Sequence, residues 1–447
     1  MQDGFKRKLS SISCIDAREG ARTLKEELNY AIDLVEKGQV EQGLNLLLSI
    51  ESNLHDEEKY YLAEKYFEWG NTERALSIVE DLHELYPDET DISLFLADLF
   101  IDSDKEDEAI TVLNSISPTE QGYPQALLLL ADLYQMQGLN EVSERKLQEA
   151  KKLLPNEPII DFALGEFYFH KADYKKAYGY YEEVLKEASV LAGISIHQRL
   201  AESLSLTGSF EEALPFYEKA AEEQPDLQTL FGYGFTAMQG GFYGTAISQF
   251  QALKEMDPQY TSLYLHLAKA YEHEGMLKES LQTVKEGLSE DEFNKELYLY
   301  GGKIALKAQR PEEAEALLRE AVALDPGHVE AIITLTNILL VEEKFEDVAD
   351  VLNETAKYGE EDPQFDWNMA KAQYHLENYS DALNLYQTAY NSFKDNQAFL
   401  IEYAFLLMEE GDRKEAKKLF DKVLAEDPAN VEIQEIVMQL EDEFSLE

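Results

Sequence analysis

Few residues of this chain have the types and spacing that enzyme chemistry needs. The sequence contains no phosphate-binding G-x-x-x-x-G-K-[ST] motif, no H-E-x-x-H zinc motif and no nucleophile elbow. Gly240, Gly241 and Gly244 lie close together, but no predicted strand precedes them, as a phosphate-binding loop would require. His266 and His273 could share a helix face, yet no carboxylate stands at a metal-binding offset from them. We therefore expect no catalytic residue, no metal site and no cofactor.

The balance of charge is the most unusual property of the composition. The 447 residues include 39 basic and 89 acidic side chains, which gives a formal net charge of −50. Nucleic acids and anionic membrane surfaces attract Lys and Arg, so this charge argues against direct binding to either. The charge favours partner proteins with basic surfaces instead. Proteins that themselves handle nucleic acid, such as polymerase or ribosome-associated factors, have such surfaces.

Cysteine usage and hydropathy predict a cytoplasmic protein. Cys14 is the only cysteine, so no disulfide can form within the chain. No stretch approaches the roughly 18 uninterrupted apolar residues of a membrane-spanning helix. The basic residues Lys6, Arg7 and Lys8 are followed by a segment that is too polar for a signal peptide.

Alanine, aromatic and proline residues recur along the chain at fixed offsets. The pattern A-x3-[F/Y/L]-x2-[A/x]-x4-P is clearest in the set Ala213, Tyr217, Ala220 and Pro225, and it returns in sets that end at Pro258, Pro326 and Pro428. A second pattern precedes these sets and is clearest at Tyr264, Leu267, Ala268, Tyr271 and Gly275. Such regular recurrence is typical of a repeat architecture.

These residues and spacings resemble the tetratricopeptide repeat, with its W-x2-L-G-x2-Y, its turn glycine, its A-x3-F-x2-A and its closing proline. A 34-residue period, as in that repeat, gives twelve units that begin at Leu24, Asp56, Thr90, Pro124, Pro158, Ile194, Leu227, Thr261, Lys295, Val329, Pro363 and Gln397. The resemblance implies an all-α, right-handed superhelical solenoid of helix-turn-helix repeats that binds other proteins. Within this superfamily, the length and acidity are similar to those of the YpiA-type bacterial cytosolic proteins.

The repeats divide the chain into three predicted parts. Residues 1–23 have no periodicity and are predicted to be a disordered extension, residues 24–430 form the repeats, and residues 431–447 form a capping helix with a polar outer face. Thr23 and Glu26 have the spacing of a capping box, which places a helix start between the first two parts.

Two small-residue positions recur within the repeats. A glycine at the turn between the two helices allows a left-handed backbone, at Gly38, Gly70, Gly138, Gly208, Gly241, Gly275 and Gly411. An alanine in the second helix permits close helix approach, at Ala75, Ala109, Ala177, Ala213, Ala246, Ala314, Ala382 and Ala416.

In the tetratricopeptide family the ninth position of each first helix points into a concave groove, and here that column changes character along the chain. Its first half holds the acids Glu64, Asp98, Asp132, Glu166 and Glu202, and its second half holds Lys269, Lys303, Asn337 and Lys371. Two interpretations fit this column. Either the charges form local ion pairs with neighbouring helices, or the groove is bipolar and its acidic half binds a basic protein surface or peptide.

Two further groups of residues could contact a partner. Phe231, Phe235 and Met238 form a predicted apolar patch between the two halves, on a helix that also holds Gly232 and Gly234. These glycines predict either a flexible joint or a weak repeat.

Asn337 and Asn368 match the asparagine pair of the clamps that bind chaperone tails. Ile333, Ala398 and Glu402 stand where the basic residues of such a clamp would be, so we do not expect chaperone-tail recognition.

We therefore predict a non-catalytic scaffold or adaptor that holds protein partners in its concave groove. The alternative is a peptide-sensing receptor that regulates a partner protein. The sequence makes no prediction about oligomeric state.

Overall fold

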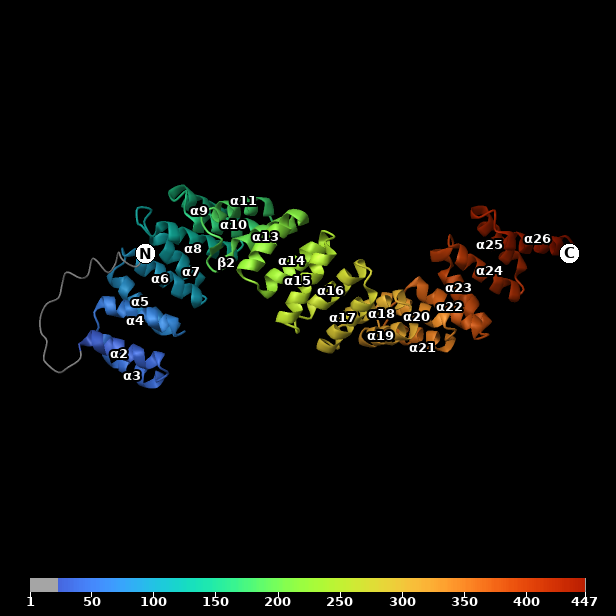
Figure 1. Ribbon diagram of the computed structural model, residues 1–447, viewed down its shortest axis with the longest axis horizontal. Helices are drawn as coiled ribbons and strands as arrows, with labels where there is room; N and C mark the ends of the chain where they lie inside the picture. The colour runs from blue at the N-terminus through green and yellow to red at the C-terminus, as the bar shows by residue number, and fades with distance from the viewer. Residues whose placement is uncertain (1–22, 447) are drawn as a thin grey trace. The chain divides into compact units, whose positions relative to one another are not determined.

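The fold was analysed in a computed structural model, which describes residues 23–446 (Figure 1). Those residues form 25 α-helices, one short 3₁₀ helix and one two-stranded hairpin. The chain divides between Ser209 and Phe210 into two compact units, called unit 1 and unit 2 below. The predicted disordered extension lies outside the described residues, except for Thr23.

Unit 1 contains the first eleven described helices. They are α2 (Leu24–Glu36), α3 (Val40–Ile50), α4 (Asp56–Glu68), α5 (Thr72–Leu85), α6 (Thr90–Asp102), α7 (Glu106–Ser115), α8 (Tyr123–Met136), α9 (Asn140–Leu153), α10 (Pro158–His170), α11 (Tyr174–Leu185) and α12 (Ile196–Leu206). The 3₁₀ helix η1 (Glu51–Asn53) follows α3. The hairpin strands β1 (Val190–Leu191) and β2 (Ile194–Ser195) precede α12 and pair antiparallel, with Val190 opposite Ser195.

Unit 2 contains the remaining fourteen helices. They are α13 (Phe210–Glu223), α14 (Leu227–Gln239), α15 (Tyr243–Met256), α16 (Ser262–His273), α17 (Leu277–Glu290), α18 (Lys295–Lys307), α19 (Pro311–Leu324), α20 (Val329–Val341), α21 (Phe345–Ala356), α22 (Pro363–His375), α23 (Tyr379–Phe393), α24 (Gln397–Glu409), α25 (Arg413–Glu426) and α26 (Val431–Leu446).

The helix starts follow the predicted repeat closely. The first helices of the twelve repeats are α2 and then every second helix up to α24, and nine of them begin at the predicted residue. The clearest difference is α12, which begins at Ile196 instead of Ile194 because Ile194 belongs to the hairpin. Ala192 and Gly193 both have positive φ there, at 52° and 79°, which suits a tight two-residue hairpin turn. The repeat period carries no signal for such an insertion.

The first helix illustrates how each element is specified locally. Leu28, Ala31, Ile32 and Val35 are buried and recur at the spacing of one helix face. Thr23 caps the helix, since its Oγ1 accepts from the backbone N–H of Glu26 at 3.3 Å and Glu26 returns a bond to the Thr23 N–H at 2.8 Å. The predicted capping box is therefore present.

The small residues occupy the tight positions predicted for them. All seven turn glycines have φ between 73° and 88°, and all eight second-helix alanines are fully buried. At the same turn the structure also places non-glycine residues with positive φ, at Asp104, Ala172, Gln309, Glu343 and Glu377.

The local packing gives Gly232 and Gly234 a role other than that of a flexible joint or a weak repeat. A Cβ on Gly232 would lie 2.8 Å from the Tyr217 hydroxyl, and one on Gly234 would lie 2.9 Å from the Phe250 ring. Both glycines make room for aromatic rings of the flanking second helices. The division of the chain into units falls elsewhere, between α12 and α13.

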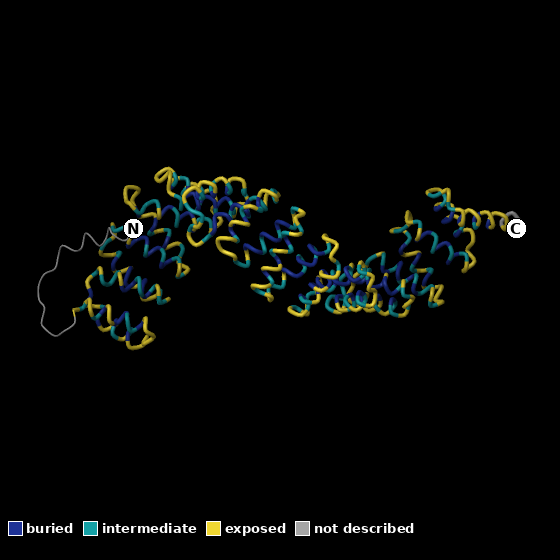
Figure 2. Tube along the Cα trace, viewed as in Figure 1, coloured by how far each residue is buried: buried dark blue, intermediate teal, exposed yellow. Residues whose placement is uncertain are grey.

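Within each unit, buried residues lie between the paired helices and exposed residues follow their outer faces and turns (Figure 2). Successive helices pack as pairs, and from α6 onward each first helix also contacts the second helix before it, as α12 does with α11. Helix α26 lies where the cap is predicted. It contacts α25 and buries Ile433, Val437 and Leu440.

Candidate functional site

A cavity of about 910 Å³ in unit 1, called the unit 1 cavity, is lined by four successive first helices. Its lining residues are Lys25, Leu28 and Asn29 of α2, Glu57, Glu58, Tyr60, Tyr61, Glu64, Lys65, Phe67 and Glu68 of α4, Asp91, Leu94, Phe95 and Asp98 of α6, and Gln125 of α8. Glu64 and Asp98 are two of the five predicted acids. Six carboxylates and two lysines therefore surround the cavity, which gives it a negative charge.

Three aromatic rings form one wall of the unit 1 cavity. The Phe95 ring meets the Tyr60 ring edge-on at a centroid distance of 5.5 Å, and it meets Phe67 at 5.9 Å. Burial raises the pKa of Tyr60, and the nearby carboxylates Glu64 and Asp98 raise it further. The aromatic wall and the carboxylates are thus close enough to contact the same bound group.

Asp98 and Asp132 have no hydrogen-bond or ion-pair partner within residues 23–446. Burial raises the pKa of both carboxyl groups, and His170 opposes this effect at Asp132. Asp98 is half-buried in the cavity, while Asp132 on α8 keeps an exposed side chain although neighbouring residues surround much of its carboxyl group. A carboxylate that is partly desolvated without a counter-ion is stabilised when a cation binds to it.

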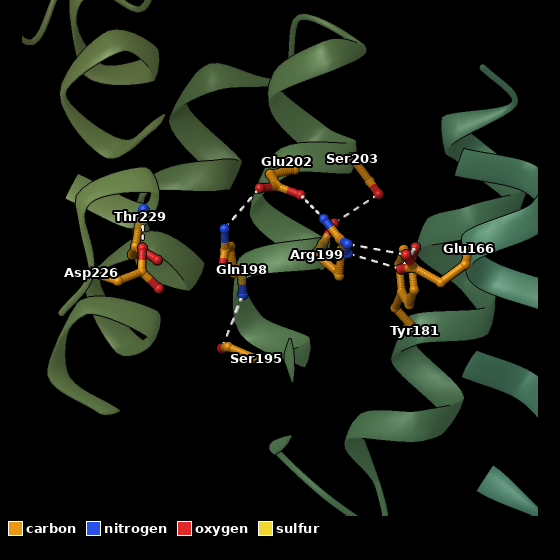
Figure 3. Close-up of polar contacts among 9 residues, drawn as sticks. All are labelled: Glu166, Tyr181, Ser195, Gln198, Arg199, Glu202, Ser203, Asp226 and Thr229. Carbon is orange, nitrogen blue, oxygen red and sulfur yellow. Dashed lines mark hydrogen bonds and ion pairs between the residues drawn. The ribbon is translucent and has the colours of Figure 1, made fainter. Parts of the chain in front are cut away.

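The other two predicted acids of unit 1 are held by an arginine of the same unit (Figure 3). Arg199 donates two hydrogen bonds to Glu166, from Nε at 2.8 Å and from Nη2 at 3.0 Å. Its third nitrogen donates to Glu202 at 2.8 Å, and Tyr181 donates to Glu166 at 2.6 Å. For Glu166 and Glu202, local ion pairing is therefore the interpretation that the structure supports.

The predicted apolar patch of unit 2 is largely used within the unit. Phe231 stacks on Phe235 at 6.2 Å and contacts Tyr260 at 5.4 Å. His266 lies against both phenylalanines, at 5.6 and 5.3 Å. Met238 is half-buried and packs on the same cluster. These side chains expose only part of their apolar surface.

A second cavity, of about 580 Å³, lies between α16, α18 and α20 and contains two of the predicted lysines. Lys303 pairs with Glu330 at 2.5 Å, and the neighbouring Lys307 pairs with Glu272. Lys269 lies 5.8 Å from the Tyr300 ring centre and has no ion-pair partner in the described residues. Carboxylates from the same walls thus neutralise most of this basic group.

Lys371 is also paired within the chain. Its Nζ lies 3.2 Å from Glu402 Oε1 and 4.3 Å above the Trp367 ring. Trp367 Nε1 donates to the other oxygen of Glu402 at 2.7 Å. Glu402, at the position of a basic clamp residue in the chaperone-tail binders, therefore serves as the counter-ion of Lys371.

The two predicted asparagines do not form a pair in the groove. Asn337 is exposed, but Asn368 is fully buried, so the expectation that Asn368 contacts a partner is wrong. Asn368 Nδ2 donates to Thr336 Oγ1 at 2.9 Å and to Asn337 Oδ1 at 3.1 Å. These bonds join α22 to α20 and give the buried amide of Asn368 hydrogen-bond partners. Without such partners, burial of this polar group would be costly.

The residues first considered for chemistry lie apart from these cavities. His266 packs among aromatic rings, whereas His273 stacks on Tyr243 at 4.3 Å, so the two histidines share no site. Gly241 is a left-handed turn residue. Within residues 23–446 no group of three His, Cys, Asp or Glu side chains could hold a metal ion.

Sequence reasoning missed the residues that distinguish the acids from one another. Arg199 stands three residues before Glu202, and Phe95 stands three residues before Asp98, at the equivalent place in its repeat. The residue three positions before the acid would therefore have distinguished Glu202, which has Arg199 there, from Asp98, which has Phe95. The aromatic wall could have been found in the same way.

Paired helices, left-handed turns and buried second-helix alanines define a tetratricopeptide-repeat protein. General tetratricopeptide-repeat profiles match residues 66–133, 194–227 and 305–374. The YpiA-like profile matches residues 135–189, and the profile of the YpiA-like C-terminal repeats matches residues 363–430.

The tetratricopeptide-repeat-containing protein YpiA of Bacillus subtilis (strain 168) is 52% identical to this chain over 418 residues. That alignment covers 94% of this chain and 99% of the relative. The chain therefore belongs to the YpiA family of tetratricopeptide-repeat proteins.

Solved structures resemble the chain more distantly. The Cut9–Hcn1 hetero-tetramer of the APC/C is 12% identical, with 94% of this chain and 97% of that chain covered at a TM-score of 0.37. YrrB, described as a repeat protein with an unusual peptide-binding site, is 17% identical, with 42% of this chain and 95% of that chain covered at a TM-score of 0.37. No helix within residues 23–446 is long and apolar enough to cross a membrane.

Proposed function

We propose that this protein is a non-catalytic scaffold that binds a basic segment of a partner protein along the first helices of unit 1. The observation that carries this proposal is the unit 1 cavity, where carboxylates and aromatic rings line about 910 Å³. Repeat proteins of this class commonly use such concave surfaces for binding.

The charge of the chain supports a basic partner. A formal net charge of −50 attracts cationic surfaces over long range and speeds their association at low salt. Proteins that handle nucleic acid, such as polymerase or ribosome-associated factors, carry basic surfaces of this kind. They are the class of partner that we propose.

The acidic side of the groove is a better candidate for the partner-binding site than the basic side. Asp98 and Asp132 form no ion pair with the described residues, so a partner could supply a cation without breaking an existing pair. A partner for Lys303 or Lys371 would first have to displace Glu330 or Glu402.

The test is a titration with a short labelled peptide of alternating arginine and serine. The variant Asp98→Asn/Asp132→Asn should bind it about tenfold more weakly, because partly exposed ion pairs contribute up to about 1 kcal/mol each. Raising the salt from about 0.1 M to about 1 M should weaken binding to the unmodified protein as well, because the Debye length falls from about 10 Å to about 3 Å.

The matched control is Glu80→Gln/Asp81→Asn, which removes the same charge from exposed positions on the second helix α5. This control should bind the peptide as the unmodified protein does. An equal loss in both double variants would mean that the peptide responds to net charge alone, which would overturn the proposed site.

A further inference from the structure

The cavity between α16, α18 and α20, called the unit 2 cavity below, is lined by equal numbers of basic and acidic side chains. They are Lys269, Lys303, Lys307, Glu272, Glu296 and Glu330. The cavity is therefore formally neutral, in a chain whose net charge is −50. How these six groups pair with one another decides whether any charge remains available to a ligand.

Glu272 stands three residues after Lys269 on α16, at a spacing that permits an ion pair within one helix. Residues of α18 hold Glu272 instead. Lys307 pairs with it, and the Tyr300 hydroxyl donates to it at 2.5 Å. Although burial acts in the opposite direction, hydrogen bonds from Lys307 and Tyr300 hold the pKa of the Glu272 carboxyl group below its ordinary value. Glu272 is thus committed to α18 and does not serve Lys269.

The other two glutamates of the unit 2 cavity also have partners of their own. Glu330 pairs with Lys303 at 2.5 Å, and Glu296 Oε1 lies 3.4 Å from His328 Nε2. Lys269 forms no ion pair within residues 23–446, and it lies near an aromatic ring whose centre is 5.8 Å from its Nζ. A ring at that distance attracts an ammonium group only weakly. The charge of Lys269 is therefore left unmatched by the described carboxylates.

Apolar side chains lie on both sides of Lys269. On the α14 side, Phe235 and Met238 belong to the same hydrophobic cluster as Leu265 of α16, and Leu265 also lines the unit 2 cavity. On the α18 side, Leu306 lines the cavity. All four apolar side chains are half-buried. Because α16 contacts both α14 and α18, they form an apolar strip across three successive first helices (Figure 1).

We propose that the unit 2 cavity binds a segment of a partner protein in which one glutamate or aspartate stands between apolar residues. The carboxylate of this segment pairs with Lys269, and its apolar side chains lie on the strip formed by Phe235, Met238, Leu265 and Leu306. This second docking site is separate from the site proposed in unit 1 and selects the opposite charge. No ion pair has to break, in contrast to binding at Lys303 or Lys371.

The surroundings of Lys269 limit how acidic the segment is. A net charge of −50 repels polyacidic segments over long range, and Glu296 and Glu330 on the cavity wall repel additional carboxylates. One unmatched cation therefore selects one carboxylate. Since the apolar strip continues from Lys269 towards both neighbouring first helices, the bound segment continues on both sides of its carboxylate. This arrangement suits an acidic side chain within a segment better than the carboxylate at a chain end.

The first test titrates the protein with labelled peptides whose ends are acetylated and amidated. In a glycine–serine background, two leucines flank a central residue that is glutamate or glutamine. The glutamate peptide should bind about fivefold more tightly, as expected for one partly exposed ion pair. Replacing its two leucines with serine should weaken it, because the contact with the apolar strip is lost.

Two results of this titration would overturn the proposal. The first is equal affinity of the glutamate and glutamine peptides. The second concerns a peptide whose only carboxylate is a free C-terminus after leucine. Tighter binding of that peptide than of the glutamate peptide would mean that the ligand is a chain end.

The second test changes Lys269 itself. Lys269→Gln should abolish the preference for the glutamate peptide, whereas Lys269→Arg keeps a cation and should retain most of it. The matched control Lys278→Gln removes the same charge from an exposed position on the second helix α17 and should bind as the unmodified protein does. An equal loss in Lys269→Gln and Lys278→Gln would mean that the peptide responds to net charge alone, which would overturn the site. Circular dichroism identifies any variant that fails to fold.

The third test looks for a gain of affinity. Glu330 is 61% exposed, and Glu330→Gln would release Lys303 and remove a repelling carboxylate from the cavity. The glutamate peptide should then bind about two- to fivefold more tightly. The control Glu320→Gln removes the same charge from an exposed position on α19 and should give a smaller gain. Equal affinities of these two variants would overturn the placement of the carboxylate in this cavity.

This proposal does not rest on the site in unit 1, and one variant separates the two. Asp98→Asn/Asp132→Asn, which should weaken the basic peptide, should bind the glutamate peptide at least as tightly as the unmodified protein does. If the basic peptide binds and the glutamate peptide does not, the unit 2 site is overturned and the proposed function survives. If only the glutamate peptide binds, the opposite holds.

Discussion

Unit 1 and unit 2 carry charges at the same column of their first helices but treat them differently. In unit 1, Asp98 and Asp132 form no ion pair within the described residues, while in unit 2 Lys303 and Lys371 each pair with a glutamate. A column of like charges therefore does not define a binding surface by itself. What matters is whether the neighbouring helices supply the opposite charge.

The units also differ in their turns. Unit 2 has three successive repeats whose left-handed turn residue is not glycine, at Gln309, Glu343 and Glu377. Unit 1 has two such residues, Asp104 and Ala172, separated by Gly138. A left-handed backbone costs a residue with a Cβ roughly 1–2 kcal/mol. The turns of unit 2 therefore store more local strain.

The largest effect is expected at the charge network around Arg199 in unit 1. Arg199→Ala leaves Glu166 and Glu202, whose side chains are 21% and 14% exposed, without a cation. We expect the free energy of unfolding to fall by about 2 kcal/mol, between the values typical of exposed and of buried ion pairs. Urea unfolding followed by circular dichroism measures this change.

A variant in unit 2 tests whether the loss of stability depends on how far the ion pair is buried. Lys371→Ala in unit 2 removes a cation that also lies above an aromatic ring, but Glu402 there is 36% exposed. We expect a loss below about 1 kcal/mol. Equal losses for Arg199→Ala and Lys371→Ala would break the comparison between the two units.

The next effect concerns the strained turns of unit 2. Glu343→Gly should raise the free energy of unfolding by about 1 kcal/mol, because φ at this exposed residue is 58° and glycine adopts it without strain. Glu343→Ala removes the same charge but keeps the Cβ, so it should give no such gain. Thermal unfolding of the two variants side by side distinguishes relief of strain from loss of a surface charge.

The pH dependence should have opposite signs at a carboxylate of each unit. Burial raises the folded pKa of Asp98, so its contribution to stability is fully present below the unfolded pKa and is lost as pH rises through the folded pKa. Lys344, opposed by burial and assisted by Arg319, holds the pKa of Glu315 below its ordinary value. That contribution is present above the unfolded pKa and is lost as pH falls through the folded pKa.

Two variants that replace these carboxylates with neutral amides measure the sign of each contribution to the pH dependence of stability. As pH rises from acid towards neutral, Asp98→Asn should gain stability relative to the unmodified protein, whereas Glu315→Gln should lose it. Unfolding free energies at a series of pH values give the two slopes. Slopes of the same sign would mean that Asp98 is paired in solution.

The smallest effect is expected at the lysines of the unit 2 cavity. Lys303→Gln breaks an ion pair whose Lys and Glu side chains are 35% and 61% exposed, so the unfolding free energy should change by less than about 0.5 kcal/mol. A much larger loss would show that this pair supports unit 2 as Arg199 supports unit 1.

The sequence alone determined most of the architecture. Repeat starts, glycine turns and second-helix alanines follow from local backbone geometry and from the period of one helix pair, both of which are written directly in residue spacing. It could not determine the hairpin that delays α12 to Ile196 or the division of the chain after Ser209. Both depend on contacts that interrupt the period, and the period itself does not record them.

For the candidate site, the resemblance to the repeat family predicts which column faces the groove, but the sequence does not indicate which of its charges remain available. The five acids are equivalent in spacing, yet Arg199 reaches two of them and leaves Asp98 beside an aromatic wall. Asn368 likewise matches a clamp residue in sequence and is fully buried in the fold. Only the tertiary structure decided these outcomes, because the partner of a side chain comes from a neighbouring helix about one repeat away, and its reach and burial depend on how the helices pack.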